Sequence, residues 1–219
     1  SGVLTPSFTI SSDLGFTPST PYYQIIDETS DVEFTTYKYQ YRGLGVKSRY
    51  RKLWDRAELN ATVYAANVAT YKKNRELVGA VDTTYASRIG NGWDIRANLR
   101  RASQDTFMRR YDFNDDTSLK STISATRTID NRYYRVEASD RQSLLASDKT
   151  LNEPTVLPSI FYEKIEKGWR ANQKFRTELS AVQLDNDQGY DMARWSSIFE
   201  VAEDFYLPLG IANYEANAT

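Results

Sequence analysis

The chain has 219 residues, and its 28 lysine and arginine residues nearly balance 29 aspartate and glutamate residues, for a net charge of −1. This length allows one or two domains, and the charge balance gives no bulk field that would attract nucleic acid. The absence of histidine and cysteine excludes Ser-His-Asp and Cys-His catalysis, disulfides and most zinc or iron sites. We therefore predict no enzyme activity, no catalytic residue, no cofactor and no metal site for this chain.

Alternation of apolar and polar residues with a period of two dominates the sequence. Between Trp93 and Leu99, for example, the odd positions are apolar and the even positions are polar. This pattern predicts strands with one apolar and one polar face, and no window shows a convincing helical stripe. The predicted strands are 3–12, 16–26, 31–41, 44–53, 56–67, 79–90, 93–104, 116–128, 132–143, 155–166, 169–183 and 194–204, with another beginning near 210. The fold class is all-β.

The strands and their connections indicate a membrane protein. Strands of about ten residues exceed the usual globular length and match the 9–11 residues that cross a bilayer with a tilt. Short turns are expected at Asp27–Ser30, Leu53–Asp55, Gly90–Gly92, Ile129–Asn131, Lys167–Gly168 and Asp204–Leu209. Long polar loops are expected at Val68–Val78, Asp105–Asp115, Leu144–Pro154 and Leu184–Ala193. Short turns on one edge and long loops on the other are typical of outer-membrane barrels, so we predict an antiparallel transmembrane β-barrel with about 12–13 strands of a larger barrel present.

Large aromatic residues recur beside the short turns. They are spaced by one hairpin pair, 36–40 residues, and comprise Trp54, Trp93, Tyr133, Tyr134, Trp169, Phe205 and Tyr206. We predict that they form an aromatic girdle at one membrane interface, although each could instead pack on its own turn.

Three of the six prolines fall in the first two predicted strands. Pro6 is expected in the middle of the first strand, and Pro18 and Pro21 in the second, whereas residues 31–143 contain no proline. Because proline has no N–H to donate, it belongs at strand edges or in weakened pairings. The alternative is that these prolines only mark irregular strand starts.

Several short motifs stand out near the start of the chain: SGVLTPSF at 1–8, GF at 15–16, STPYY at 19–23, YRGL at 41–44, RYR at 49–51 and, later, Leu157-Pro158-Ser159. By these motifs the first fifty residues resemble the LptD family of lipopolysaccharide-assembly outer-membrane proteins. Gln24 stands where that family usually has tryptophan, and the remainder is similar mainly in strand rhythm.

The resemblance implies a barrel of about 26 strands in the outer membrane of a Gram-negative bacterium. Residues 1–219 would be the N-terminal portion of this barrel domain, without the preceding periplasmic jellyroll and the closing strands. The partners implied are lipopolysaccharide, outer-membrane lipids, the plug lipoprotein LptE, and the bridge protein LptA through the missing N-terminal domain. Lipopolysaccharide would leave sideways through a lateral gate at the first strands, where Pro6 and Pro21 match the family's gate prolines and Pro18 does not.

A basic strip on one strand is a second candidate site. Lys47, Arg49 and Arg51 share one face of the predicted strand 44–53. They are candidates for contacts with lipid phosphates in the lumen, or they pair with Glu33, Glu58 or Asp94 in an ordinary polar lumen.

Other functions remain open from the sequence. A porin or substrate-specific diffusion channel shares the alternation but not the proline-bearing first strands. An outer-membrane phospholipase or protease barrel would need catalytic residues outside this chain, and a soluble β-sandwich or propeller would dissolve without detergent.

Overall fold

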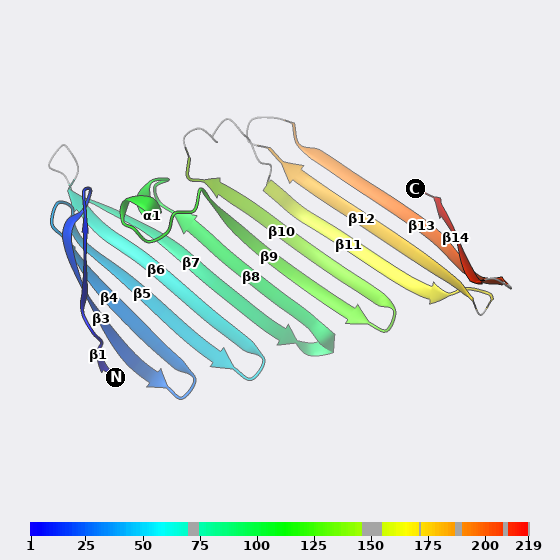
Figure 1. Cartoon of the computed structure of the whole chain (residues 1–219), viewed down its shortest axis with the longest axis horizontal. Coiled ribbons are helices and arrows are strands. Elements are labelled where there is room, and N and C mark those ends of the chain that lie inside the picture. The colour runs from blue at the N-terminus through cyan, green and yellow to red at the C-terminus, as the bar shows by residue number, and fades with distance from the viewer. Residues whose placement is uncertain (70–74, 146–154, 171, 187–189, 208–209, 219) are drawn as a thin grey trace. The chain divides into compact units, whose positions relative to one another are not determined.

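The computed structural model of this chain describes residues 1–69, 75–145, 155–170, 172–186, 190–207 and 210–218, with the backbone alone given for Val68, Ala69, Arg75, 205–207 and 210–218. Its strands are β1 (Gly2–Val3), β2 (Ser7–Ser11), β3 (Gly15–Asp27), β4 (Ser30–Tyr39), β5 (Gly43–Trp54), β6 (Ala57–Ala69), β7 (Arg75–Ile89), β8 (Trp93–Ala102), β9 (Ser118–Ile129), β10 (Arg132–Ser143), β11 (Thr155–Lys167), β12 (Gln173–Asp185), β13 (Met192–Leu207) and β14 (Gly210–Ala218). The remaining elements are a 3-10 turn, Gly90–Gly92, and a short helix, α1 (Phe107–Arg110) (Figure 1).

The strands form one 14-stranded sheet in which chain order is spatial order. The path runs β1-β3-β4 and then consecutively to β14, while β2 also pairs with β3. The pairings are antiparallel, as hairpin connections require. The prediction of an all-β antiparallel sheet is therefore confirmed. Among the described residues, no helix is long and apolar enough to cross a bilayer.

The chain divides into two compact units. The first contains Ser1–Ser87, Arg96–Thr122 and Arg141–Asn152, and the second contains Arg88–Ile95, Ile123–Asp140 and Glu153–Thr219. In the first unit, short turns join β3 to β4 and β5 to β6 at one end of the sheet. The connections from β4 to β5 and from β6 to β7 lie at the opposite end. We call these the short-turn end and the long-loop end of the sheet.

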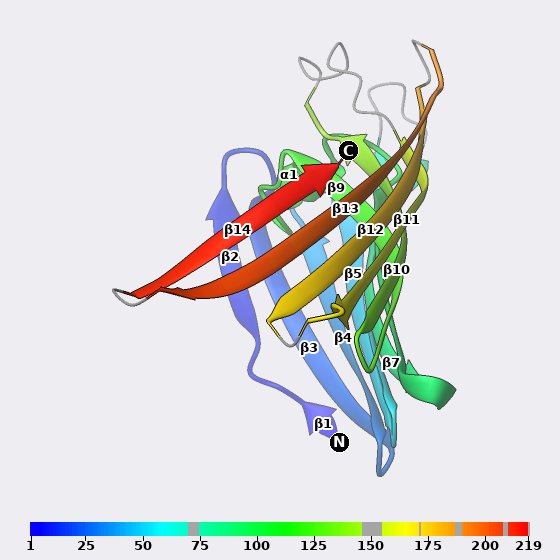
Figure 2. The same ribbon diagram turned by 90° about the vertical axis from the view of Figure 1, so that its right-hand side faces the viewer.

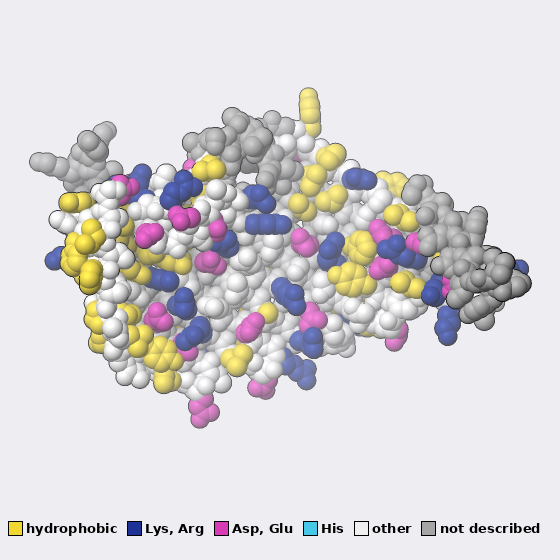
Figure 3. All heavy atoms as spheres, in the orientation of Figure 1, with side chains coloured by type: hydrophobic (Ala, Val, Ile, Leu, Met, Phe, Trp, Pro, Cys, Tyr) yellow, Lys and Arg dark blue, Asp and Glu magenta, His cyan; other side chains and the backbone are white. Residues whose placement is uncertain are grey.

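The register of the first unit separates two faces. Tyr22, Phe34, Ser48 and Val63 lie opposite one another across β3 to β6 on what we call the apolar face. The neighbouring positions in each strand project to the other side, which we call the polar face. In the view of Figure 3, lysine and arginine side chains lie interspersed with aspartate and glutamate across the strands.

Three predictions about local structure are wrong. The predicted first strand, 3–12, is interrupted between β1 and β2, so Pro6 lies outside any strand. In the expected loop Val68–Val78, residues 68–69 and 75–78 are strand, because β6 reaches Ala69 and β7 begins at Arg75, and residues 70–74 lie outside the described residues. The expected loop Asp105–Asp115 contains α1, where no helix was predicted.

Candidate functional site

The first strand is bulged where it crosses β3. Val3 lies opposite Tyr22, but Ser7 lies opposite Ser19, so residues 4–6 face only residues 20–21. One extra residue on one side of an antiparallel pair is a β-bulge, which disrupts the ladder locally. Pro6 is part of this bulge, and it cannot donate a ladder hydrogen bond there. The edge of the sheet is therefore paired in two short pieces, β1 and β2 (Figure 2).

Pro21 weakens the same pairing from the β3 side. Its carbonyl oxygen accepts a hydrogen bond from the Leu4 N–H at 2.9 Å. In an antiparallel strand the N–H and C=O of one residue point to the same neighbour, so the missing N–H of Pro21 is missing toward the first strand. Pro18 lies three positions before Pro21, so its backbone groups point to the opposite neighbour, β4. It stands just beyond the end of the β3–β4 ladder, which begins at the pair Ser19–Tyr37.

The edge strands carry no charge on either face. Residues 1–26 contain no lysine or arginine and a single carboxylate, Asp13, which lies in the turn between β2 and β3. On the polar face the hydroxyls of Ser7 and Ser19 are 2.8 Å apart. On the apolar face Phe8 is 67% exposed and packs on Phe16 with ring centroids 5.7 Å apart. The edge thus keeps the two-faced pattern of the sheet with hydroxyls in place of charges.

The predicted basic strip lies on the polar face of β5, two strands further along. Arg51 pairs with Asp31 at 2.8 Å, and Arg49 lies opposite Glu33 in register. The Lys47 ammonium lies 5.6 Å from the centre of the Tyr64 ring. Of the three predicted acidic partners, only Glu33 lies opposite a basic residue of the strip, because Glu58 lies opposite Leu53 and Asp94 pairs with Arg88.

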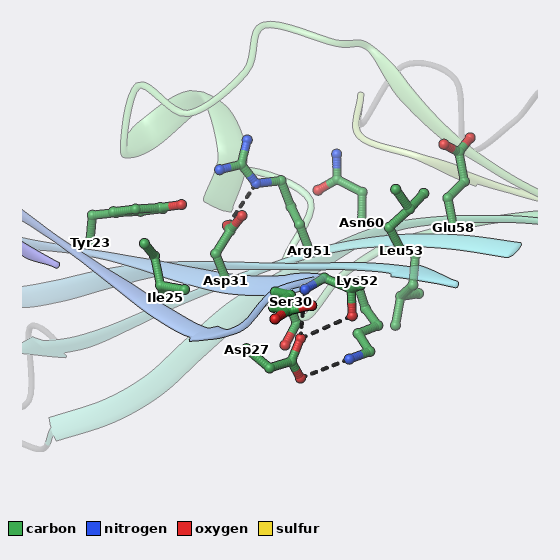
Figure 4. Close-up of a pocket in the computed structure, with 13 residues that line it drawn as sticks. Tyr23, Ile25, Asp27, Ser30, Asp31, Arg51, Lys52, Leu53, Glu58 and Asn60 are labelled. Atoms are coloured by element: carbon green, nitrogen blue, oxygen red, sulfur yellow. Dashed lines mark hydrogen bonds and ion pairs between the residues drawn. The ribbon is translucent and has the colours of Figure 1, made fainter. Parts of the chain in front are cut away.

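A hollow of about 650 Å³ adjoins this strip at the short-turn end of β3 to β6. Figure 4 shows Tyr23, Asp31, Arg51 and Asn60 on one side of the strands, with the Asp31–Arg51 ion pair between them. Lys52 and its partner Asp27 lie on the other side, 2.8 Å apart. The hollow therefore combines an aromatic ring, a paired guanidinium and an amide at the end of the sheet where β1 also begins.

The connection between β8 and β9 is folded onto the polar face at the long-loop end, which the sequence did not predict. Phe107 and Met108 of α1 are 1% and 2% exposed. They belong to a buried cluster with side chains of the polar face, which comprises Leu14, Tyr39, Ala66, Val78, Ala80, Ala102, Tyr111, Leu119 and Leu144, with Tyr37, Tyr64 and Phe113 packed against it. Phe113 contacts Tyr64 at 4.6 Å and Tyr37 at 5.6 Å between ring centroids.

Polar contacts hold this folded connection in place. Arg100 on β8 donates hydrogen bonds to Asp82 on β7 and to Asp116 in the connection, and the Asn114 side-chain amide also donates to Asp116. The Arg100 guanidinium holds the pKa of Asp116 below its ordinary value. The Gln142 side chain accepts a hydrogen bond from the N–H of Ala102 and donates one to its C=O; Ala102 is the last residue of β8.

Two apolar residues of β9 differ in burial. The alternation predicts Leu119 and Ile123 on the same face, but Leu119 is buried in the cluster while Ile123 is 57% exposed. Between them, the Ser121 hydroxyl bonds both the N–H and the C=O of Arg100. A side chain that replaces a backbone partner interrupts the ladder at this point.

The residues predicted to form the aromatic girdle lie beside the turns. Trp54 ends β5 and Trp93 begins β8; Trp169 follows β11 and is almost fully exposed. Trp93 contacts Tyr134 at 6.4 Å, whereas Tyr133 contacts Phe161. Adjacent strand residues project to opposite faces, so only Tyr134 of this pair shares a face with Trp93. The side chains of Phe205 and Tyr206 lie outside the described residues.

The part of the chain that the structure describes contains no cluster of side chains that could bind a metal ion. No group of three or more aspartate and glutamate residues there is arranged to hold an ion. The unusual features are instead the weakly paired edge, the basic strip and the folded connection.

Comparison with known proteins gives one consistent family. The family model described as LPS transport system D matches residues 76–219, from β7 to the end of the chain. This match does not include the first fifty residues, whose motifs resemble the same family. LPS-assembly protein LptD of Pseudomonas aeruginosa is 28% identical over 203 residues, 85% of this chain and 21% of that protein. The Shewanella denitrificans LptD is 24% identical over 199 residues, 85% of this chain and 25% of that protein. The Shewanella oneidensis LptD is 31% identical over 139 residues, 62% of this chain and 16% of that protein.

This chain thus spans a quarter or less of the length of these relatives. The family match covers well over half of the chain and agrees with the antiparallel sheet of long strands. It places the chain in the outer membrane of a Gram-negative bacterium and confirms the predicted fold class of an outer-membrane barrel. The chain belongs to the LptD family of the lipopolysaccharide transport system.

Proposed function

We propose that this chain is the N-terminal portion of the barrel domain of a lipopolysaccharide translocon, and that lipopolysaccharide leaves the barrel sideways through a gate formed by β1, β2 and β3. The observation that carries the gate is the interrupted edge, with residues 4–6 bulged opposite Thr20 and Pro21. The translocon role comes from the family and from the relatives' names.

The energetics favour opening at this edge. Each ladder hydrogen bond stabilises a pairing by about 0.5–1.5 kcal/mol in water, and more where lipid offers no alternative partner. In the pairing of β1 and β2 with β3, Pro6 and Pro21 each lack an N–H donor. The bulge at residues 4–6 also shifts the register of the ladder. β5 and β6, in contrast, stay in register from Gly43–Val68 to Trp54–Ala57. Opening the edge therefore breaks fewer bonds than opening the sheet elsewhere in this unit.

The composition of the edge fits an amphiphilic substrate. A lipid that leaves sideways must pass its acyl chains through the opening, and a charge there would be costly to expose to hydrocarbon. Residues 1–26 offer only Asp13, in a turn, and present hydroxyls toward the polar face. Pro18 loosens the neighbouring β3–β4 ladder at its end and is the third residue of the proposed gate, after Pro21 and Pro6.

The basic strip supplies a route for phosphates within the lumen. Lys47 and Arg49 face the lumen without an ion pair among the described residues, whereas Arg51 is already held by Asp31. We assign phosphate contacts first to Lys47 and Arg49 for this reason. The lipoprotein LptE as plug, and LptA acting through a preceding periplasmic domain, complete the proposal as partners that the family implies.

A photo-crosslinking experiment tests the gate in the full-length protein. A photoreactive amino acid at Thr9, on the polar face of β2, should capture newly made, pulse-labelled lipopolysaccharide during transport. The matched position is Leu59, on the apolar face near the short-turn end of β6, where no lipopolysaccharide should pass. Equal capture at both positions, or none at Thr9, contradicts the gate. Steady ionic conductance of the intact protein in planar bilayers would instead favour a diffusion channel.

A further inference from the structure

The apolar face carries a second hollow, at the long-loop end of β4 to β7. It encloses about 350 Å³ and is lined by Thr36, Tyr37, Leu44, Gly45, Val46, Ala65, Ala66, Asn67 and Leu77. Most of these residues belong to the apolar face by register, so the hollow opens to the outside of the sheet and not to the basic strip. It is separate from the edge strands of the proposed gate.

Cross-strand rows explain the depth of this hollow. One row runs Thr36, Val46, Ala65 and Gly79 across four strands, and these side chains are small. A Cβ atom at Gly79 would lie 2.5 Å from the Tyr64 carbonyl oxygen, so only glycine fits there. The next row toward the long-loop end includes Leu44 and Leu77, which stand out at 63% and 76% exposure. Small side chains bordered by protruding leucines form a groove of acyl-chain character.

A lysine stands at the rim of the groove. Lys38 lies directly opposite Leu44 on the same face and is exposed. It makes no hydrogen bond or ion pair with any residue that the structure describes. Asn67, also opposite Leu44, adds an exposed amide to this row. A lysine and an amide above an apolar groove on a membrane-facing wall match the order of a lipid, with phosphate at the interface and acyl chain below.

We propose that this groove is a binding site for one phosphorylated, multiply acylated lipid of the leaflet at the long-loop end, with an acyl chain on Ala65 and Val46 and a phosphate on Lys38. In an outer membrane, this chemistry is that of lipid A. The charge favours it over a zwitterionic phospholipid, because Lys38 brings a positive charge that no described residue pairs, and its row of Leu44, Asn67 and Leu77 contains no acidic residue. The site does not rest on the proposed gate, since binding at equilibrium requires no transport.

The experiment measures retention of lipid by the full-length protein in detergent, using native mass spectrometry with purified lipid A, dephosphorylated lipid A and phosphatidylethanolamine. Ala65→Trp fills the groove, and Ala61→Trp is its matched control on the same face of β6. Lys38→Gln removes the positive charge, and Lys38→Arg keeps it. Thermal unfolding of each variant verifies that the barrel is intact.

We expect Ala65→Trp and Lys38→Gln each to weaken lipid A binding about tenfold, the effect of losing one charge-assisted contact or its equivalent in packing. Ala61→Trp and Lys38→Arg should bind as the unmodified protein does. Unchanged binding in Ala65→Trp, an equal loss in Ala61→Trp, or equal retention of dephosphorylated lipid A or phosphatidylethanolamine would overturn the site. None of these results changes the expectation for crosslinking at Thr9, so the two proposals fail separately.

Discussion

The Leu4 N–H donates to the Pro21 carbonyl oxygen at 2.9 Å, and Pro21 has no N–H with which to return the bond. This half-made pair stands next to the bulge that separates β1 from β2. A hydrogen-bonded residue pair in an intact antiparallel ladder exchanges two such bonds. The first strand is therefore held at this point by half of the usual contacts, within an edge that carries no charge.

The folded connection between β8 and β9 should contribute strongly to stability. Phe107→Ala removes the most buried large side chain of the cluster and should lower the free energy of unfolding by about 3–5 kcal/mol. Guanidinium unfolding of the full-length protein in lipid vesicles measures this change. Thr106→Ala, an exposed neighbour, is the control, and equal midpoints for the two variants would show that the connection does not pack on the sheet.

Arg100 should hold this connection closed. Arg100→Gln leaves Asp82 and Asp116, both partly exposed, without their cation, at a cost of about 0.5–1.5 kcal/mol. The connection should then open more often, and a cysteine at Phe113 should react faster with a soluble thiol reagent. Arg109→Gln, on the exposed side of α1, should leave the reaction rate unchanged. An unchanged rate in Arg100→Gln would mean that the aromatic contacts alone hold the connection.

The two faces of the sheet should respond differently to an added charge. Val63→Arg places a cation on the apolar face and should cost about 2–4 kcal/mol if the site is near the bilayer midplane. Thr84→Arg, exposed on the polar face of β7, should cost much less. Unfolding titrations in vesicles compare the two variants. Equal costs would reverse or abolish the assignment of the membrane-facing side.

The long-loop end should face the cell exterior. Asp115→Cys, exposed in the connection between β8 and β9, should be labelled on whole cells by a reagent that does not cross the membrane. Asn91→Cys, in the turn between β7 and β8, should be labelled only after the membrane is opened. Phe113, although central in the connection, is unsuitable for this comparison because it is packed against Tyr64. Labelling of both cysteines on intact cells would contradict the topology.

The period-two alternation predicted nearly every strand, because each strand has one apolar and one polar face. It failed where the ladder is interrupted, as at residues 4–6. It also missed the packing of Phe107 and Phe113, because their partners lie far away in the sequence. Four large apolar residues between positions 107 and 113 were the available signal, since a solvated loop seldom needs them.

The candidate site was predictable to a similar degree. The prolines and the basic strip were found from their positions alone, and the strip does share one face. The sequence alone does not show which ladder each proline weakens, because that depends on the direction in which the backbone groups of β3 point. The pairing of Arg51 with Asp31 required the register between β4 and β5, which the sequence leaves open.

The rate of lipopolysaccharide delivery by Pro21→Ala tests the gate most directly. The substitution restores an N–H that points toward the first strand, worth about 0.5–1.5 kcal/mol, and should reduce the open population and the delivery rate about two- to tenfold. Pro6→Ala should have a smaller effect because Pro6 lies in the bulge, and Pro158→Ala in β11 should have none. Cells with equal amounts of folded barrel should show slower delivery for Pro21→Ala; delivery at the unmodified rate would contradict a gate at β1, β2 and β3.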